Sequence, residues 1–234
     1  MKISSSQTDA IETHRPGGLT LTRAALDYCS LAPGERVLDA GCGYGATCSF
    51  LHEEAGFKVF GMDASAERIA LATARSTGWG GVRARLPRLP FAPDAFKGIF
   101  CECVLSLVPD KPSCLDNFFE LLQSGGHLVL TDLYLPGATP VSLHSPALTC
   151  LDGALNKTDL IRIIEQAGFK IRIWEDHTPL LKQMACEMVF KHGSLENFWN
   201  TLTGDVFHCG LGSRCRAGEL KPGYCLIVAD KVTE

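Results

Sequence analysis

The sequence lacks the long apolar runs that mark a membrane-spanning or an exported protein. No stretch of its 234 residues approaches the roughly 18 consecutive apolar residues of a spanning helix. The first residues, Met1 to Ser6, are not followed by the apolar run of a signal peptide. We therefore expect a cytoplasmic protein that has no membrane partner.

A basic stripe is also missing. Lys and Arg total 22 against 26 for Asp and Glu, which gives a net charge of −4. Phosphate contacts dominate nucleic-acid affinity, so this balance argues against a nucleic-acid partner. Hydrophobic residues make up 46% of the chain, which is enough for a sizeable core. The length predicts a single domain over residues 1–234, as a monomer or a homodimer.

Cysteine, by contrast, is frequent, with 11 residues. In a cytoplasmic chain most of them should be reduced thiols. The spacing of Cys209, Cys215 and Cys225 is not that of a zinc ribbon, and we predict no metal ligands. Three interpretations stay open: small core hydrophobes, a redox or iron–sulfur role, and a soft-metal or metalloid site that would include Cys101, Cys103, Cys150 and Cys186.

Short apolar segments alternate with segments of helical spacing along most of the chain, which predicts right-handed β-α-β units and a parallel sheet. The expected strands are 36–40, 58–63, 82–85, 98–103, 127–132, 169–174 and 224–229. The expected helices are 19–31, 46–55, 66–77, 111–123, 158–167, 179–191 and 195–202. Three segments depart from this rhythm: a cap at 1–30, a lid-like insertion at about 136–156 and a helical insertion at about 179–222.

A glycine loop follows the first expected strand. Residues 41–46 read Gly-Cys-Gly-Tyr-Gly-Ala and lead into a helix. Glycines at such a turn let a ligand approach the backbone and leave N–H groups open at the helix start. Both a dinucleotide site and a nucleoside site fit this pattern.

Two carboxylates sharpen that choice. Asp39 precedes Gly41 by two residues and would repel a pyrophosphate, so it favours a cationic ligand. Asp63 ends the second expected strand, where a carboxylate can accept hydrogen bonds from both ribose hydroxyls. Together they predict a site for a cationic nucleoside, and S-adenosylmethionine carries a sulfonium and an ammonium but no phosphate.

Several motifs then resemble those of class I S-adenosylmethionine-dependent methyltransferases, with the nearest match in the type-11 group of ubiquinone/menaquinone C-methyltransferases and arsenite methyltransferases. These are Val-Leu-Asp-Ala-Gly-Cys-Gly-Tyr-Gly at 37–45, Val-Phe-Gly-Met-Asp-Ala-Ser at 59–65, Leu-Pro-Phe at 89–91 and Leu-Leu-Gln-Ser-Gly-Gly-His-Leu-Val-Leu at 121–130. The resemblance covers about residues 20–135. It implies a Rossmann-like α/β fold, a doubly wound seven-stranded sheet that is mostly parallel with one antiparallel strand near the C-terminus. It also implies a cofactor site made by Asp39, Gly41, Cys42, Gly43, Met62, Asp63, Arg85, Leu86 and Cys101.

The chain departs from the family pattern at four places. Arg85 stands where relatives place an Asp that binds the adenine amine, so Leu86 and apolar neighbours would have to hold the base. Lys97 replaces a second Asp, and residues 106–109 lack the His often found after the fourth strand. The asparagine-proline-proline-aromatic motif of many amino-group methyltransferases is absent, which disfavours exocyclic base amines as acceptors.

The methyl acceptor, a small molecule, should lie above the carboxyl ends of the fourth and fifth strands. Alternation along a strand places Cys101 and Cys103 on one face and Glu102 on the other, as a packing or solvent carboxylate. Asp132 and Tyr134 lie at the end of the fifth strand. Methyl transfer needs position more than acid–base groups, so the sequence leaves the catalytic residues unknown.

The sequence thus favours an S-adenosylmethionine-dependent methyltransferase that acts on a small molecule. The alternatives are a thiol-rich, arsenite-type methyltransferase, an NAD(P)-dependent oxidoreductase, and a protein that binds the cofactor without catalysis.

Overall fold

The computed structural model describes residues 13, 15–76, 78–137, 150–193 and 221–232. The expected helix at 195–202 and residues 194–220 of the expected helical insertion lie outside these ranges. Within them, no helix is long and apolar enough to cross a membrane.

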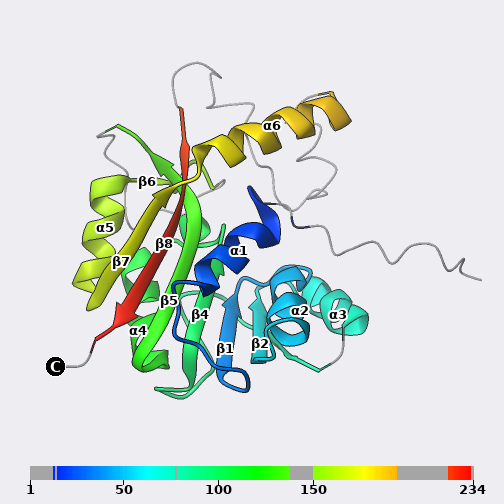
Figure 1. The fold of residues 1–234 in the computed structure, drawn as a ribbon, viewed down its shortest axis with the longest axis vertical. Coiled ribbons are helices and arrows are strands. Elements are labelled where there is room, and N and C mark those ends of the chain that lie inside the picture. Colours follow the sequence, from blue (N-terminus) through cyan, green and yellow to red (C-terminus); the bar gives the residue numbers. More distant parts are fainter. Residues whose placement is uncertain (1–12, 14, 77, 138–149, 194–220, 233–234) are drawn as a thin grey trace, which may run out of the picture.

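One twisted sheet organises the chain (Figure 1). Its strands lie in the order β3-β2-β1-β4-β5-β8-β7, and a short strand, β6, pairs with the end of β5. The bounds are β1 Arg36–Ala40, β2 Lys58–Asp63, β3 Gly80–Arg83, β4 Phe96–Glu102, β5 Leu122–Leu135, β6 Leu155–Asn156, β7 Phe169–Asp176 and β8 Gly223–Lys231. Only β8 among these strands runs antiparallel to its neighbours, β5 and β7. The predicted α/β fold with one antiparallel strand near the C-terminus is therefore confirmed, and β6 adds an eighth strand.

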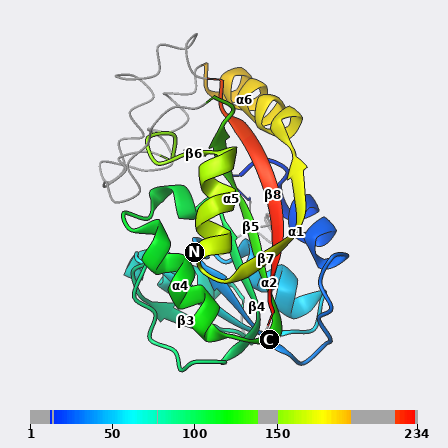
Figure 2. The same ribbon diagram turned by 90° about the vertical axis from the view of Figure 1, so that its left-hand side faces the viewer.

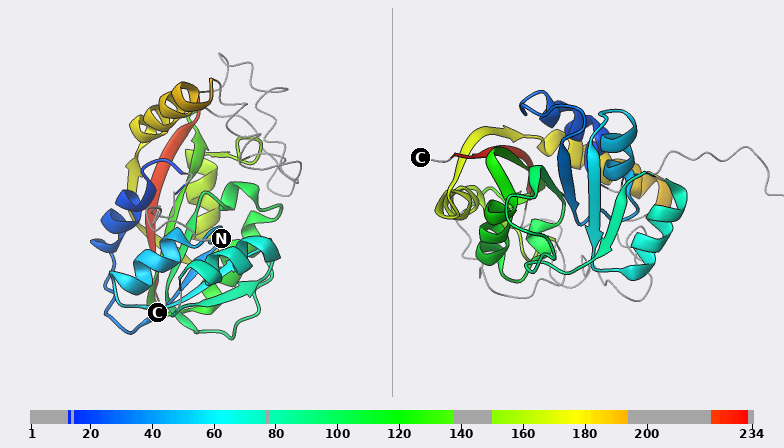
Figure 3. Two further views of the ribbon diagram at one scale, coloured as in Figure 1. Left: turned by 90° about the vertical axis from the view of Figure 1, so that its right-hand side faces the viewer. Right: turned by 90° about the horizontal axis from the view of Figure 1, so that it is seen from below.

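Helices cover both faces of the sheet. On one face lie α1 (Gly18–Leu26), α2 (Ala46–Glu53) and α3 (Ala66–Arg75), as Figure 3 shows. On the other face lie α4 (Lys111–Leu121) and α5 (Lys157–Gln166), which Figure 2 shows in front of the strands. Strand residues alternate between the two cores, since Val37 and Phe100 face the first and Leu38 and Cys101 the second.

Helix starts follow local capping chemistry. The side chains of Ser65, Asp110 and Asn156 accept hydrogen bonds from backbone N–H groups in the first turns of α3, α4 and α5. Such caps satisfy donors that a helix leaves open at its start. Because β1, β2, β3, β4 and β5 are parallel, their carboxyl ends meet at one edge of the sheet.

Several expected helix ends were placed too late, those of α1 and α4 among them. α1 ends at Leu26 rather than residue 31, and α4 ends at Leu121 rather than residue 123. Residues 124–126 belong to β5, because Leu122 already pairs with Phe96 of β4. A register shift between Phe96 and Gly98 accommodates this early start.

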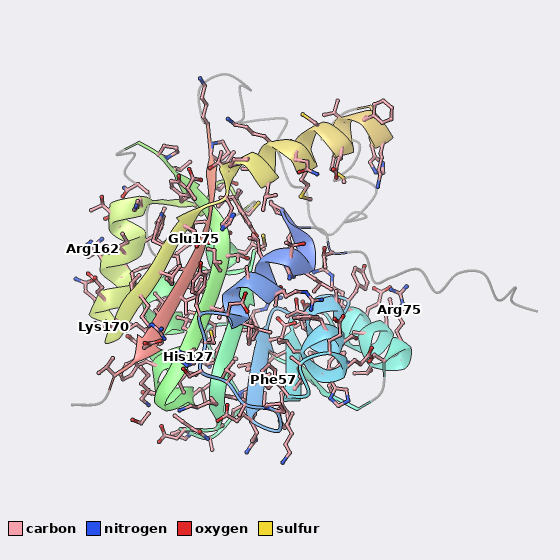
Figure 4. All side chains as sticks on the ribbon, in the orientation of Figure 1. Phe57, Arg75, His127, Arg162, Lys170 and Glu175 are labelled. Carbon is pink, nitrogen blue, oxygen red and sulfur yellow. The ribbon has the colours of Figure 1, made fainter. Side chains whose placement is uncertain are left out.

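Polar contacts tie the turn after α1 to the distant strands β5 and β7. The Tyr28 hydroxyl donates to Glu175 at 2.6 Å, and the Ser30 N–H donates to Nε2 of His127 at 3.0 Å. Nδ1 of His127 lies 2.8 Å from Asp230 of β8. Figure 4 labels His127 and Glu175, which hold this turn against the sheet.

The two expected insertions are described in part. Residues 155–156 of the lid-like segment form β6 and so belong to the sheet, while 138–149 lie outside the described residues. The helical insertion begins with α6 (Thr178–His192), none of whose residues is buried, and Phe190 is 93% exposed. Figure 1 shows α6 extending away from the sheet at the edge where the parallel strands end.

Candidate cofactor site at the carboxyl edge

The glycine loop joins β1 to α2 at this edge. The N–H groups of Gly41 and Cys42 both donate to the carbonyl of Met62, at 2.8 and 2.9 Å. This fastens the loop to the end of β2. Gly41, Gly43 and Gly45 all have positive φ, a region that L residues with a Cβ rarely adopt.

The glycines of the loop differ in what lies in front of them. A Cβ at Gly41 would meet Val104, and a Cβ at Gly45 would meet Trp79. A Cβ at Gly43 would meet nothing within 4 Å. The first and last glycines are thus needed for packing, whereas Gly43 leaves open space that a ligand can approach.

Asp63 lies beside this open glycine. Its Oδ2 accepts a hydrogen bond from the Gly43 N–H at 3.1 Å, and its Oδ1 accepts one from the Ser65 N–H at 2.8 Å. Each carboxylate oxygen has further lone pairs. The backbone therefore fixes the orientation of a carboxylate that keeps the capacity to accept hydroxyl donors.

Asp39 is more deeply placed, with 3% of its surface exposed. The Cys48 thiol of α2 lies 3.3 Å from its Oδ2. Burial raises the pKa of Asp39 to about 7, and Glu102 adds to the rise while Arg15 opposes it. Burial thus destabilises the ionised form of Asp39, and a cation bound nearby would stabilise it.

Glu102 faces away from Cys101, as alternation predicted, but it is a buried member of an ion pair rather than a packing or solvent carboxylate. It is 7% exposed and forms an ion pair with Arg15, whose Nη2 lies 2.9 Å from its Oε2. The hydroxyls of Thr22 and Thr47 each accept from Arg15 and donate to Glu102. Sequence reasoning missed this network because its members come from the segment before α1, from α1, from α2 and from β4.

Cys101 and Cys103 do not share a face, so that prediction is wrong. Cys101 is fully buried in the core under α4. Cys103 lies past the end of β4, where its N–H still donates to the carbonyl of Thr131 in β5 at 2.6 Å and its φ of 57° turns the chain. Its sulfur lies 3.0 Å from the Tyr224 hydroxyl, on the face of Glu102. Burial and Asp132 raise the pKa of Cys103 to about 12.

The remaining predicted contacts are spread along the same edge. Arg85 follows β3 and its side chain is exposed, while Leu86 beside it is 8% exposed and packs in the core. The Met62 side chain is also buried, and the residue meets the loop through its carbonyl. Cys42 is 8% exposed and faces the core of α2. The glycine loop and the ends of β2 and β3 thus converge, while the side chains of Met62, Leu86 and Cys101 all lie in the core under α4.

Asp132 holds the turn that carries Cys103. Its Oδ2 accepts from the Ser106 N–H at 2.7 Å, and the residue is 4% exposed. Burial raises the pKa of Asp132, although the Ser106 hydrogen bonds oppose the rise. Within the described residues, no group of three His, Cys, Asp or Glu side chains is arranged to hold a metal ion.

Comparisons with known proteins agree with this geometry. Residues 31–168 match the model of a family described as a methyltransferase domain. An arsenite methyltransferase of Halobacterium salinarum is 31% identical over 61% of this chain and 39% of its own length. Phosphoethanolamine N-methyltransferase 1 of Arabidopsis thaliana is 28% identical over 72% of this chain and 35% of its own. The chain thus matches less than half the length of either relative.

A solved structure shows the same fold. Phosphoethanolamine N-methyltransferase 2 of Haemonchus contortus, in complex with S-adenosyl-L-methionine, superposes with a TM-score of 0.72 at 21% identity. The match covers 94% of this chain and 54% of that one. With a family model over more than half of its residues and this fold around its glycine loop, the chain belongs to the methyltransferase domain family.

Proposed function

We propose that the protein is an S-adenosylmethionine-dependent methyltransferase that acts on a small molecule. The observation that carries this proposal is the edge formed by Gly43, Asp63 and Asp39. Open space lies in front of Gly43, and the oriented carboxylate of Asp63 lies beside it. Behind the loop lies Asp39, whose negative charge the neighbouring cation does not fully balance. That set suits a ribose and a cationic amino-acid tail.

The cofactor supplies a methyl group on a sulfonium, which passes to a lone pair of the acceptor and leaves a neutral thioether. The chain's own task is to hold the two reactants in line and to exclude water. The turn 103–107, anchored by Asp132 and packed on Gly41, lies at the edge where we expect the acceptor. It is the element we assign to acceptor positioning.

Ligand binding separates this proposal from a nicotinamide-dependent oxidoreductase. Asp39 behind the loop opposes a pyrophosphate, so we expect S-adenosylhomocysteine to raise the melting temperature and NADH to leave it unchanged. Stabilisation by NADH alone would overturn the proposal. Stabilisation by S-adenosylhomocysteine without methyl release from labelled cofactor, across amine, thiol and metalloid acceptors, would favour a binding protein without catalysis.

The acceptor is a second question, and the relatives name two kinds, arsenite and phosphoethanolamine. The finer resemblance to ubiquinone/menaquinone C-methyltransferases stays a prediction. One feature supports a metalloid acceptor: Cys103 is a partly exposed thiol at the end of β4. Its pKa of about 12 means that the thiol has to lose its proton when it binds a soft Lewis acid.

Single cysteine variants test the metalloid candidate. Cys103→Ser should weaken trivalent arsenite binding, measured by calorimetry. Cys101→Ser and Cys186→Ser are the matched controls, since one thiol is buried in the opposite core and the other is exposed on α6. Equal binding by all three variants and the parent protein would exclude Cys103 as a ligand.

A further inference from the structure

Four charged side chains from four different segments meet behind the glycine loop. Asp39 lies one residue before the end of β1, Asp63 ends β2, Glu102 ends β4, and Arg15 precedes α1. Arg15 and Glu102 form an ion pair at 2.9 Å, and the charges of Glu102, Arg15 and Asp63 all act on Asp39. Three of these groups are almost fully removed from water, since the side chains of Arg15 and Glu102 are 12% and 2% exposed and Asp39 is 3% exposed.

The hydrogen bonds divide the charge unequally. Glu102 forms an ion pair with Arg15 and accepts hydrogen bonds from the hydroxyls of Thr22 and Thr47. The guanidinium and two neutral donors therefore stabilise the Glu102 carboxylate. Asp39, by contrast, accepts a hydrogen bond from the Cys48 thiol, which is a weak donor. The cluster of Arg15, Glu102 and Asp39 therefore holds one cation against two carboxylates, and the uncompensated charge falls on Asp39.

We propose that Arg15 is a positioning residue that neutralises Glu102 and leaves Asp39 to exchange its proton for the cationic end of a ligand. The inference rests on the proposed cofactor, whose amino-acid tail carries an ammonium group. When that ammonium binds near Asp39, the carboxyl proton leaves to solvent and the carboxylate becomes the counter-charge. Affinity for such a ligand then rises with pH, and binding releases protons.

The groups around Asp39 are consistent with a single titration. Burial raises the pKa of the Cys48 thiol on α2 and of the Cys101 thiol on β4 well above their usual values, so both stay neutral near pH 7. Arg15 stays charged, because Glu102 keeps its pKa raised despite the opposing effect of burial. Burial holds the pKa of Asp39 at about 7, within the pH range where binding is measured.

Calorimetry of the whole protein with S-adenosylhomocysteine measures both consequences. If the Asp39 carboxyl has a pKa of about 7 and ionises on binding, the affinity should be about fivefold weaker at pH 6 than at pH 7. For the same reason, about half a proton should be released per ligand bound at pH 7. Titrations in buffers of different ionisation enthalpy give the proton count. 5′-Methylthioadenosine, which lacks the ammonium, should bind without proton release over the same range.

Variants separate a positioning role from a merely structural one. Arg15→Gln should move the rise in affinity to higher pH, because Arg15 lowers the pKa of Asp39, and Arg15→Lys should restore the parent profile. Arg23→Gln is the matched control, since Arg23 forms an exposed ion pair with Glu54 at 2.8 Å between α1 and α2. Its pH profile should match the parent.

Each outcome decides something different. Binding of S-adenosylhomocysteine with no proton release and a flat profile between pH 6 and pH 7 overturns the inference and leaves the proposed cofactor intact. A pH profile for Arg15→Gln identical to that of the parent overturns the role of Arg15. No binding of either nucleoside at any pH counts instead against the proposed function.

Discussion

Gly41 lies directly against Val104, so that a Cβ on the glycine would sit 2.3 Å from Cγ2 of the valine. The contact joins the glycine loop to the turn after β4, which carries Cys103. Gly41 also has φ of 90°, so it needs glycine for two independent reasons.

Replacing Gly41 tests that contact. Gly41→Ala should destabilise the protein by at least about 2 kcal/mol, from overpacking and from the positive φ. Val104→Ala in the same chain should recover part of this loss, since it removes the clash but not the backbone strain. Chemical denaturation of both single variants and the double variant measures the coupling. Additive effects would show that the two residues do not touch in solution.

Gly43 should respond differently. Gly43→Ala places a methyl group in open space at φ of 53°, which we expect to cost about 1 kcal/mol of stability and most of the affinity for S-adenosylhomocysteine. Gly34→Ala is a close control, because Gly34 also has a positive φ and nothing within 4 Å, in a turn before β1. It should lose similar stability and no affinity. Full binding by Gly43→Ala would place the ligand elsewhere.

Asp39 should make the unliganded protein less stable as pH rises. Its pKa is about 7 in the folded protein against 3.8 for an ordinary Asp, so between these values the folded state binds more protons than the unfolded one. Stability is then lost from about pH 4 to pH 7, by at most about 4 kcal/mol. Asp39→Asn should therefore melt above the parent at pH 8 and close to it at pH 4.

The same variant should lose cofactor binding, since it removes the counter-charge. If Asp39→Asn is more stable than the parent at pH 8 but binds the cofactor more weakly, Asp39 serves ligand binding rather than the stability of the fold. A lower melting temperature than the parent at pH 8 would contradict this account of Asp39.

Variants of Asp63 and Ser65 should distinguish a loss of ligand affinity from a loss of helix capping. Asp63→Ala removes the acceptor that we assign to the ribose, and we expect S-adenosylhomocysteine to bind at least about tenfold more weakly, since hydrogen bonds to a charged group contribute about 1.5–3 kcal/mol. Ser65→Ala removes only the side chain that caps α3, for a loss of about 1 kcal/mol in stability. Equal affinities of the two variants, measured by calorimetry, would argue against a ribose contact at Asp63.

What the sequence could predict depended on how local each pattern is. The glycine loop, Asp39 and Asp63 lie within short motifs, and the structure brings all of them to one edge of the sheet. The order of helices and strands followed from hydrophobic spacing. Helix ends were less predictable, because pairing of Leu122 with Phe96 decided where α4 gives way to β5.

The parts that were missed depend on tertiary contacts. Strand alternation placed Cys103 on the same face as Cys101, but Cys103 lies past the end of β4, where its positive φ turns the backbone and its sulfur lies beside the Tyr224 hydroxyl. Glu102 was expected to be a packing or solvent carboxylate, because its partner Arg15 lies far away in the sequence. No local spacing rule relates residues that meet only after the sheet has formed.

The position of β8 has a consequence for how the chain is made. Among the described strands β8 comes latest in the sequence, yet it lies between β5 and β7 and pairs with both. Until residues 223–231 have been synthesised, the long edge of β5 has no partner along most of its length, and an unpaired apolar strand edge is a template for aggregation. The sheet therefore closes late, through contacts of high sequence separation, and we expect slow folding with a need for protection of that edge during synthesis.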